Sequence, residues 1–270
     1  MSCVLRQLIP LLVAIESTEA MDTWKFYDIT HREHEICNPT SDAKLAQLVK
    51  LLRLPNNAQV ADIACGKGLF LMRMAEAYEI RGTGIDISPF FIAAAQQRFQ
   101  TQAPAADITF QQIDGADFKP DQHSLDLASC LGASWIFGGH ANTLAALTSM
   151  VKLGGWVIVG EPFWKQEPTQ EYLAACGCRR EDFGSFSSNA EAGEKLGLEL
   201  VHTFASNQDD WDTYEGLQWY ATSEYARAHP DAPDLAEVPQ RVNQGRTAYL
   251  RWGRDTLGWA IYLFRVRSAT

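Results

Sequence analysis

The stretch VADIACGKGLF, residues 60–70, decides the fold. An apolar strand ends there in a small turn that carries Gly66 and Gly68, and an apolar helix follows at once. A turn with little side-chain bulk lets a ligand approach the backbone, and the first N–H groups of the helix are free to bind it. The pattern predicts a ligand site at the end of a strand in an α/β sheet.

A second acidic position supports a nucleoside ligand. The apolar run Thr83-Gly84-Ile85 ends in Asp86, twenty residues past Gly66. An acidic residue at the end of the second strand can accept hydrogen bonds from both hydroxyls of a ribose. The two features together predict a site for a nucleoside-containing cofactor.

The rest of the chain alternates between strand and helix patterns. Strands are predicted over residues 59–64, 82–87, 108–113, 125–131, 156–160, 198–204 and 259–266. The first five alternate with helical patterns, which predicts a doubly wound, mostly parallel sheet with helices on both faces.

Composition narrows the function classes. The 270 residues carry a formal net charge of −10, which disfavours a nucleic-acid substrate. Six cysteines are scattered, and only Cys176-Gly177-Cys178 forms a close pair, so we expect a reduced, cytoplasmic protein with no metal site. The apolar run Leu8–Ile15 is too short to span a bilayer, so we expect an N-terminal extension and no membrane partner.

The glycine pattern separates two cofactors. Dinucleotide-binding folds use G-x-G-x-x-G, but counting from Gly66 the third glycine position holds Leu71. The run Asp62-Ile63-Ala64-Cys65-Gly66-Lys67-Gly68 instead resembles the first motif of class I S-adenosylmethionine (AdoMet) methyltransferases, with Ala64 in place of the first glycine. AdoMet carries no phosphate, so the turn need only pass beside its amino-acid part.

Later motifs extend the resemblance over residues 58–161. Asp114-Gly115 after the third strand, Leu125-Asp126-Leu127 in the fourth and Gly154-Gly155-Trp156 before the fifth follow the order and spacing of that family. The resemblance implies a seven-stranded sheet of the class I type with N-terminal cap helices. It also implies an extension over residues 1–23, a cap segment over 24–57, and a methyltransferase domain over 58–270 with a helical insertion at 209–255.

The resemblance also implies roles for single residues. Asp62, Ala64, Gly66 and Gly68 would line the methionine part of AdoMet, and Asp86 would hold the ribose hydroxyls. Asp114 would accept from the adenine amino group beside Gly115, and Leu131 would lie against the cofactor. The chain is also similar to a bacterial group of methyltransferase-like proteins in four segments: Asn38-Pro39, Gly132-Ala133-Ser134-Trp135 with Gly138-Gly139, Gly160-Glu161-Pro162-Phe163-Trp164, and Asp210-Trp211-Asp212-x-Tyr214-Glu215.

Methyl transfer needs alignment, exclusion of water and, for many acceptors, a base. Glu161 follows the fifth strand at the edge where such sheets bind ligands, so we expect it to act on the acceptor. His34 is a second catalytic candidate, with His31 and His140 as alternatives. A cationic methyl donor favours aromatic neighbours, for which Tyr27, Trp135 and Trp164 are candidates.

The aromatic-rich insertion at 209–255 is the expected acceptor lid, since long connections often carry specificity. Trp211, Asp212 and Tyr214 open it in a pattern that suits a small polar or cationic acceptor. We expect Trp211 and Tyr214 to face one cavity together with Glu161. The predicted function is methyl transfer from AdoMet to a small molecule; the alternative is a non-catalytic AdoMet-binding or regulatory protein. The acceptor and the oligomeric state stay open.

Overall fold

The computed structural model describes residues 21–267. Most of the expected N-terminal extension, including the apolar run Leu8–Ile15, lies outside the described residues. The cap segment, the central sheet and the insertion all lie within them.

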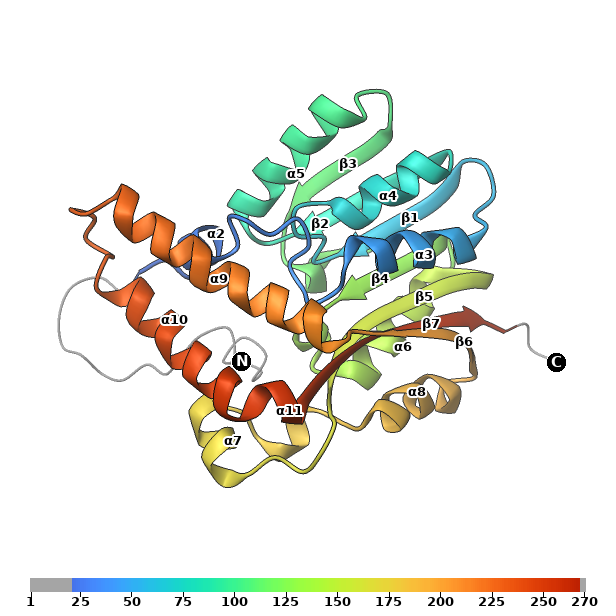
Figure 1. Cartoon of the computed structure of the whole chain (residues 1–270). Coiled ribbons are helices and arrows are strands. Elements are labelled where there is room, and N and C mark those ends of the chain that lie inside the picture. The colour runs from blue at the N-terminus through green and yellow to red at the C-terminus, as the bar shows by residue number, and fades with distance from the viewer. Residues whose placement is uncertain (1–20, 268–270) are drawn as a thin grey trace.

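One sheet of seven strands forms the centre of the molecule, in the order β3-β2-β1-β4-β5-β7-β6 (Figure 1). The strands are β1 (Ala58–Ile63), β2 (Ile80–Asp86), β3 (Asp107–Gln112), β4 (Leu125–Leu131), β5 (Val151–Trp164), β6 (Leu198–Ala205) and β7 (Leu257–Val266). The first five are parallel, and β7 runs antiparallel between β5 and β6. This arrangement confirms the predicted class I methyltransferase type of sheet.

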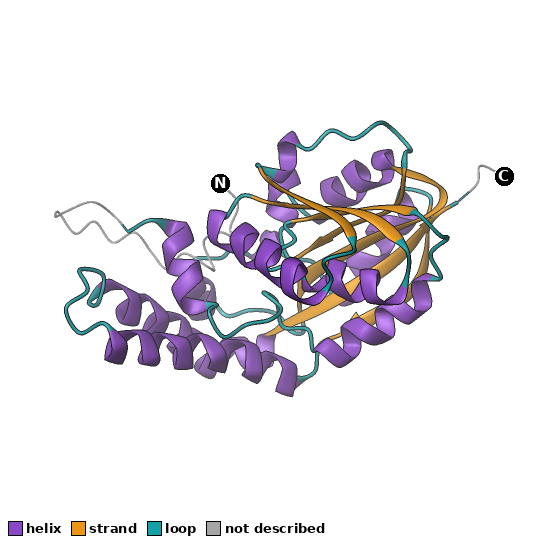
Figure 2. Cartoon of the chain, turned by 90° about the horizontal axis from the view of Figure 1, so that it is seen from above, coloured by secondary structure: helices purple, strands orange, loops and turns teal. Residues whose placement is uncertain are grey.

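Helices cover both faces of the sheet, as Figure 2 shows. The helices are α2 (Thr23–Thr30), α3 (Asp42–Leu52), α4 (Leu69–Ala77), α5 (Pro89–Gln102), α6 (His140–Met150), α7 (Gln170–Cys176), α8 (Phe186–Lys195), α9 (Gln208–Ala228), α10 (Glu237–Ala248) and α11 (Arg254–Thr256). Short turns of helix are η1 (Gly115–Asp117), η2 (Ser134–Phe137), η3 (Arg180–Asp182) and η4 (Tyr249–Gly253).

The central strands are buried on both faces because successive side chains point to opposite sides. In β5, Trp156 and Ile158 pack in the core cluster that contains side chains of α3 and α4. Val157 and Val159 point the other way and pack with Leu144 and other side chains of α6. Neighbouring residues of β5 therefore reach opposite faces of the sheet, and only one of the two can face a given ligand site.

Strand β5 is longer than the predicted residues 156–160. It begins at Val151, with a register irregularity against β4 where a turn at Gly154-Gly155 was expected. It ends at Trp164, which pairs with Leu257. The antiparallel partner β7 supplies hydrogen bonds along this extension, and a sequence pattern confined to β5 does not reveal that partner.

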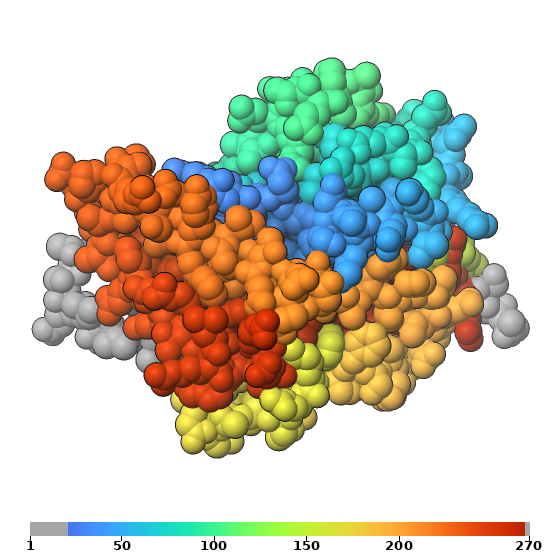
Figure 3. All heavy atoms as spheres, in the orientation of Figure 1, coloured from blue at the N-terminus to red at the C-terminus, as the bar shows by residue number. Residues whose placement is uncertain are grey.

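The insertion folds as two long helices, α9 and α10, which lie side by side beyond one end of the sheet (Figure 1). Helix α2 packs against α9 through Phe26, Ile29 and Tyr225. In Figure 3 the segment containing α2 and α3, in blue, lies between α9, in orange, and the layer of α4 and α5, in cyan and green.

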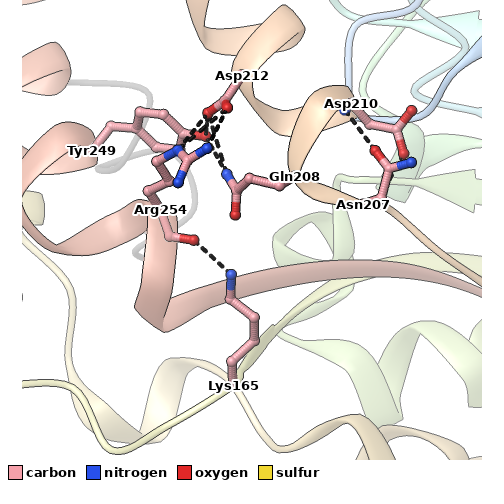
Figure 4. A network of polar contacts seen from close by, with 7 residues as sticks. All are labelled: Lys165, Asn207, Gln208, Asp210, Asp212, Tyr249 and Arg254. Carbon is pink, nitrogen blue, oxygen red and sulfur yellow. Dashed lines mark hydrogen bonds and ion pairs between the residues drawn. The ribbon is translucent and has the colours of Figure 1, made fainter.

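A polar network fastens the beginning of α9 to the chain that follows α10 (Figure 4). Asp212 accepts from Nε and Nη2 of Arg254, from the Tyr249 hydroxyl at 2.6 Å and from the side-chain amide of Gln208. The Arg254 guanidinium holds the pKa of the Asp212 carboxyl low, at about 2. Asp212 therefore anchors the insertion, and it lines neither of the two cavities described below.

Candidate active site

The turn after β1 has an unusual backbone. Ala64, Gly66 and Gly68 all have positive φ angles, of 58°, 53° and 74°. Only glycine adopts this region freely, so Ala64 carries a local strain of roughly 1–2 kcal/mol. The Asp86 carboxylate stabilises the turn, because it accepts from the backbone N–H of Gly66 at 2.9 Å and from that of Ser88 at 2.8 Å.

A first cavity opens at this turn and at the carboxyl ends of β1, β2 and β4. The predicted site residues that line it are Tyr27, Asp62, Ala64, Gly66, Asp86, Asp114, Gly115, Leu131, Trp135 and Tyr214. Seven of the eight residues predicted to hold the cofactor thus lie around one cavity, although they come from four separate stretches of the chain.

Three aspartates line this cavity. Asp62 is buried and accepts from the Ser129 hydroxyl at 2.6 Å, and burial raises its pKa to about 7 against the opposing effect of that hydrogen bond. Burial also raises the pKa of Asp86. Asp114 accepts from the backbone N–H of Ala116 through one oxygen, at 2.9 Å. Carboxylates that line a cavity can accept from ammonium, hydroxyl and amino groups of a ligand.

The basic group at the turn does not serve a phosphate. The ammonium of Lys67 donates to the carbonyl oxygens of His31 at 2.7 Å and Arg32 at 3.0 Å, so it holds the end of α2 over the cavity. The lysine side chain is half-buried in this position. A site rich in carboxylates, with its lysine engaged in this way, fits AdoMet, which has ammonium and hydroxyl donors and no phosphate, better than a dinucleotide.

A second cavity lies between the sheet and the insertion. Its walls include Trp211, Trp219, Trp259, Tyr172 and Tyr249. Four residues line both cavities and form a common wall between them, namely Cys37, Asn38, Gly132 and Tyr214. Trp211 lines the second cavity only.

Tyr214 is held in place within this wall by histidines of the cap segment. The Thr30 hydroxyl donates to the Phe26 carbonyl, so it accepts from Nδ1–H of His31, and Nε2 of His31 then accepts from the Tyr214 hydroxyl at 3.1 Å. Burial lowers the pKa of His31 well below its ordinary value, which favours this neutral form.

His34 and Trp164 lie outside both cavities, contrary to expectation. Nε2 of His34 bonds to the backbone carbonyl of Tyr214 at 2.8 Å, so the ring supports the common wall from behind. The Trp164 indole donates to the carbonyl of Arg180 at 2.9 Å and packs against Phe183. His31, the weaker alternative in the sequence, is the histidine that lines the first cavity.

Gly68 also lies outside the cavities. A Cβ atom there would come within 3.2–3.3 Å of Ala95 and Phe110, so this glycine allows α4 to pack closely against its neighbours. Its contribution is to position the turn, without lining the ligand site.

Glu161 does not converge with Trp211 and Tyr214, so that expectation was wrong. The Cβ of its neighbour Gly160 would point at Trp259, on the side of the second cavity. Because side chains alternate along a strand, Glu161 points to the opposite face, where it is buried and accepts from the Ser134 hydroxyl at 3.0 Å.

The sequence motif included Glu215, but no role in the site was predicted for it. This side chain lines the second cavity, and burial raises the pKa of its carboxyl to about 8. Glu215 follows Trp211 by four residues on α9, so the two share one helix face. That spacing was a signal that could have identified it.

Two kinds of site are absent from the described residues, 21–267. No group of three or more histidine, cysteine or acidic side chains in this range could hold a metal ion. No helix within it is long and apolar enough to cross a membrane.

Comparisons with known proteins agree with this geometry. A family model described as a methyltransferase domain matches residues 60–155. The Escherichia coli protein YjhP is 32% identical over 92% of this chain and 100% of its own length, and its X-ray structure superposes with a TM-score of 0.84.

Two crystal structures of relatives contain a cofactor product. A SAM-dependent methyltransferase from Geobacter sulfurreducens is 32% identical, with 90% of this chain and 98% of that one covered and a TM-score of 0.84. One from Thiobacillus denitrificans is 34% identical, with 92% and 100% covered and a TM-score of 0.84. Both are complexes with S-adenosyl-L-homocysteine. The chain therefore belongs to the class I AdoMet-dependent methyltransferases, and AdoMet is its cofactor.

Proposed function

We propose that this methyltransferase acts on a small-molecule acceptor that binds in the second cavity, by in-line methyl transfer. When bound, the cofactor supplies an electrophilic methyl group on a sulfonium sulfur. The observation that carries the proposal is that Cys37, Asn38, Gly132 and Tyr214 line both cavities. An acceptor beside these residues can face the methyl group and attack its carbon from the side opposite the sulfur, which leaves with the electron pair of the C–S bond.

In this proposal the residues of the first cavity hold the cofactor. Asp86 binds the ribose hydroxyls, and Asp62, Ala64 and Gly66 contact the methionine part. Asp114 and Gly115 contact the adenine. Leu131 packs against the cofactor, and Tyr27 and Trp135 close the cavity. The buried carboxylates support this assignment, because cofactor binding gives each of them a hydrogen-bond donor or a cation as a partner.

Glu215 is the proposed base for the acceptor. A general base works best with a pKa near the operating pH, and burial places that of Glu215 at about 8. The aromatic walls around it exclude water from the reacting groups.

The aromatic lining of the second cavity and the net charge of −10 support a small acceptor over a nucleic acid. The test is transfer of an isotopically labelled methyl group from AdoMet to a panel of small amines, alcohols, thiols and acids. Labelled small-molecule product with release of S-adenosylhomocysteine supports the proposal. Label incorporated only into nucleic acid or protein from an extract contradicts it.

Cofactor affinity should depend on pH through Asp62. Its pKa of about 7 lies above the ordinary carboxyl value, so ionisation of the carboxyl is completed only as the pH rises through neutrality. An ammonium group of the ligand binds the ionised form better, so affinity for S-adenosylhomocysteine should rise roughly tenfold from pH ~6 to pH ~8. Calorimetric titration measures this. Asp62→Asn should bind weakly with little pH dependence, and an unchanged pH profile in that variant contradicts the assignment.

A further inference from the structure

Arg241 is fixed against the wall of the second cavity. This residue of α10 has a side chain that is only 12% exposed. Its guanidinium lies over the ring of Phe26, 3.8 Å from the ring centroid, and Nη1 donates to Glu237 at 3.2 Å. These two contacts set the plane and the orientation of the guanidinium.

The other edge of this guanidinium has no partner. Nε and Nη2 of Arg241 are both buried, and neither makes a hydrogen bond to any of the described residues. These two nitrogens form the side-on edge that presents two parallel N–H donors, the geometry that matches two oxygens of one anion. Burying such donors without partners is costly, so their retention beside a cavity points to a ligand.

Further hydrogen-bond donors and acceptors line the same cavity. Nε1 of Trp211 is a further buried donor without a partner among the described residues, and Arg246 adds a second positive charge where the cavity meets solvent. Acceptor atoms line the cavity as well: Oδ1 of Asn38 belongs to the common wall, and Glu215 follows Tyr214 of that wall. Nδ2 of Asn38 donates to the Leu131 carbonyl at 3.4 Å, which fixes Oδ1 as the free atom.

We propose that the methyl acceptor is a small organic anion whose carboxylate or phosphate binds the free edge of Arg241. This inference rests on the proposed function, since it names the class of acceptor for the second cavity. The anionic group occupies the arginine side of the cavity. The nucleophilic N–H or O–H group then lies toward Asn38 and Glu215, which accept its hydrogen bond.

Binding of probe anions to the protein saturated with S-adenosylhomocysteine tests the inference by calorimetry. The probes are phenylacetate, phenyl phosphate and the neutral phenylacetamide, whose ring suits the aromatic walls. We expect an anion to bind more tightly than the amide, and the better of the two anions distinguishes a carboxylate site from a phosphate site.

Two substitutions locate the anion. Arg241→Gln should weaken anion binding roughly 10- to 100-fold. Arg241→Lys keeps the charge but loses the edge with two parallel N–H donors, so it should also weaken anion binding. Arg251→Gln, an exposed arginine outside both cavities, is the matched control and should bind normally. Melting temperatures of all variants show whether they are folded.

The inference is overturned if the amide binds as tightly as both anions, if no probe binds the wild-type protein, or if Arg241→Gln folds and binds anions normally. The measurement needs no turnover, so it separates the two proposals. Arginine-dependent anion binding without methyl transfer to any small molecule supports the anion site and refutes the proposed function. Methyl transfer to neutral acceptors without anion binding supports the proposed function and refutes the anion site.

Discussion

Asp86→Ala is expected to weaken binding of S-adenosylhomocysteine by about 2–4 kcal/mol, or roughly 30- to 900-fold. The alanine removes the carboxylate proposed to accept from both ribose hydroxyls. It also removes the acceptor of the Gly66 and Ser88 backbone N–H groups, so the turn that borders the cofactor is loosened as well. Calorimetric titration measures the affinity.

Asp117→Ala is the matched control, because this exposed aspartate lies just past the cavity and does not line it. Asp86→Asn keeps part of the turn, since its single amide oxygen can accept from the N–H of Gly66 or of Ser88 but not from both. If Asp86→Asn and Asp86→Ala both fold and bind the product at wild-type affinity, the ribose assignment is wrong.

Glu215→Gln is expected to lower kcat by roughly 10²-fold or more, with cofactor affinity nearly unchanged. Glutamine fills the same space but cannot take a proton from the acceptor. The wild-type rate should rise with pH through about 8, because the carboxyl must be ionised to act as a base and burial raises its pKa to that value. The pH profile of kcat/KM, measured with an acceptor from the panel, tests both statements.

Glu224→Gln, an exposed glutamate farther along α9, should leave the rate unchanged. Glu161→Gln is a sharper contrast, since Glu161 is buried but lies on the other face of the sheet. It should affect the melting temperature more than turnover. A loss of turnover in Glu161→Gln that equals or exceeds the loss in Glu215→Gln would reverse the assignment of the base.

The same pKa predicts an effect on stability. The folded form holds the Glu215 proton up to about pH 8, whereas an unfolded chain releases it near 4.5. The favourable contribution is fully present below the unfolded pKa and is lost as the pH rises toward the folded one. Glu215→Gln should therefore show a smaller fall in melting temperature than the wild type between these two pH values.

The cofactor side of the site could be predicted from sequence because it depends on local rules. A glycine-bearing turn after one strand and an acid at the end of the next place Gly66 and Asp86 at the same edge of any parallel sheet. Seven predicted residues accordingly line the first cavity. The exception, Gly68, has the positive φ that its motif implies, but its Cα faces Ala95 and Phe110.

The acceptor side could not be predicted in the same way, because it depends on tertiary packing. Whether Glu161 faces the insertion depends on which face of β5 the insertion covers, and one residue along a strand changes the face. Asp212 and Glu215 lie on the same helix, yet Arg254 holds one away from the cavity and only the other lines it. The roles of Lys67 and His31 likewise depend on where α2 lies, which the motifs of the sheet do not specify.

The proposed mechanism requires two adjoining cavities, one for the cofactor and one for the acceptor, which meet at the residues that line both. A crystal structure of this protein with S-adenosylhomocysteine tests that requirement most directly. We expect the ribose hydroxyls on Asp86 and the sulfur facing Asn38, Gly132 and Tyr214, with the second cavity open to it at these residues. A sulfur that faces away from these residues, or a second cavity closed off from it, would contradict the proposed mechanism.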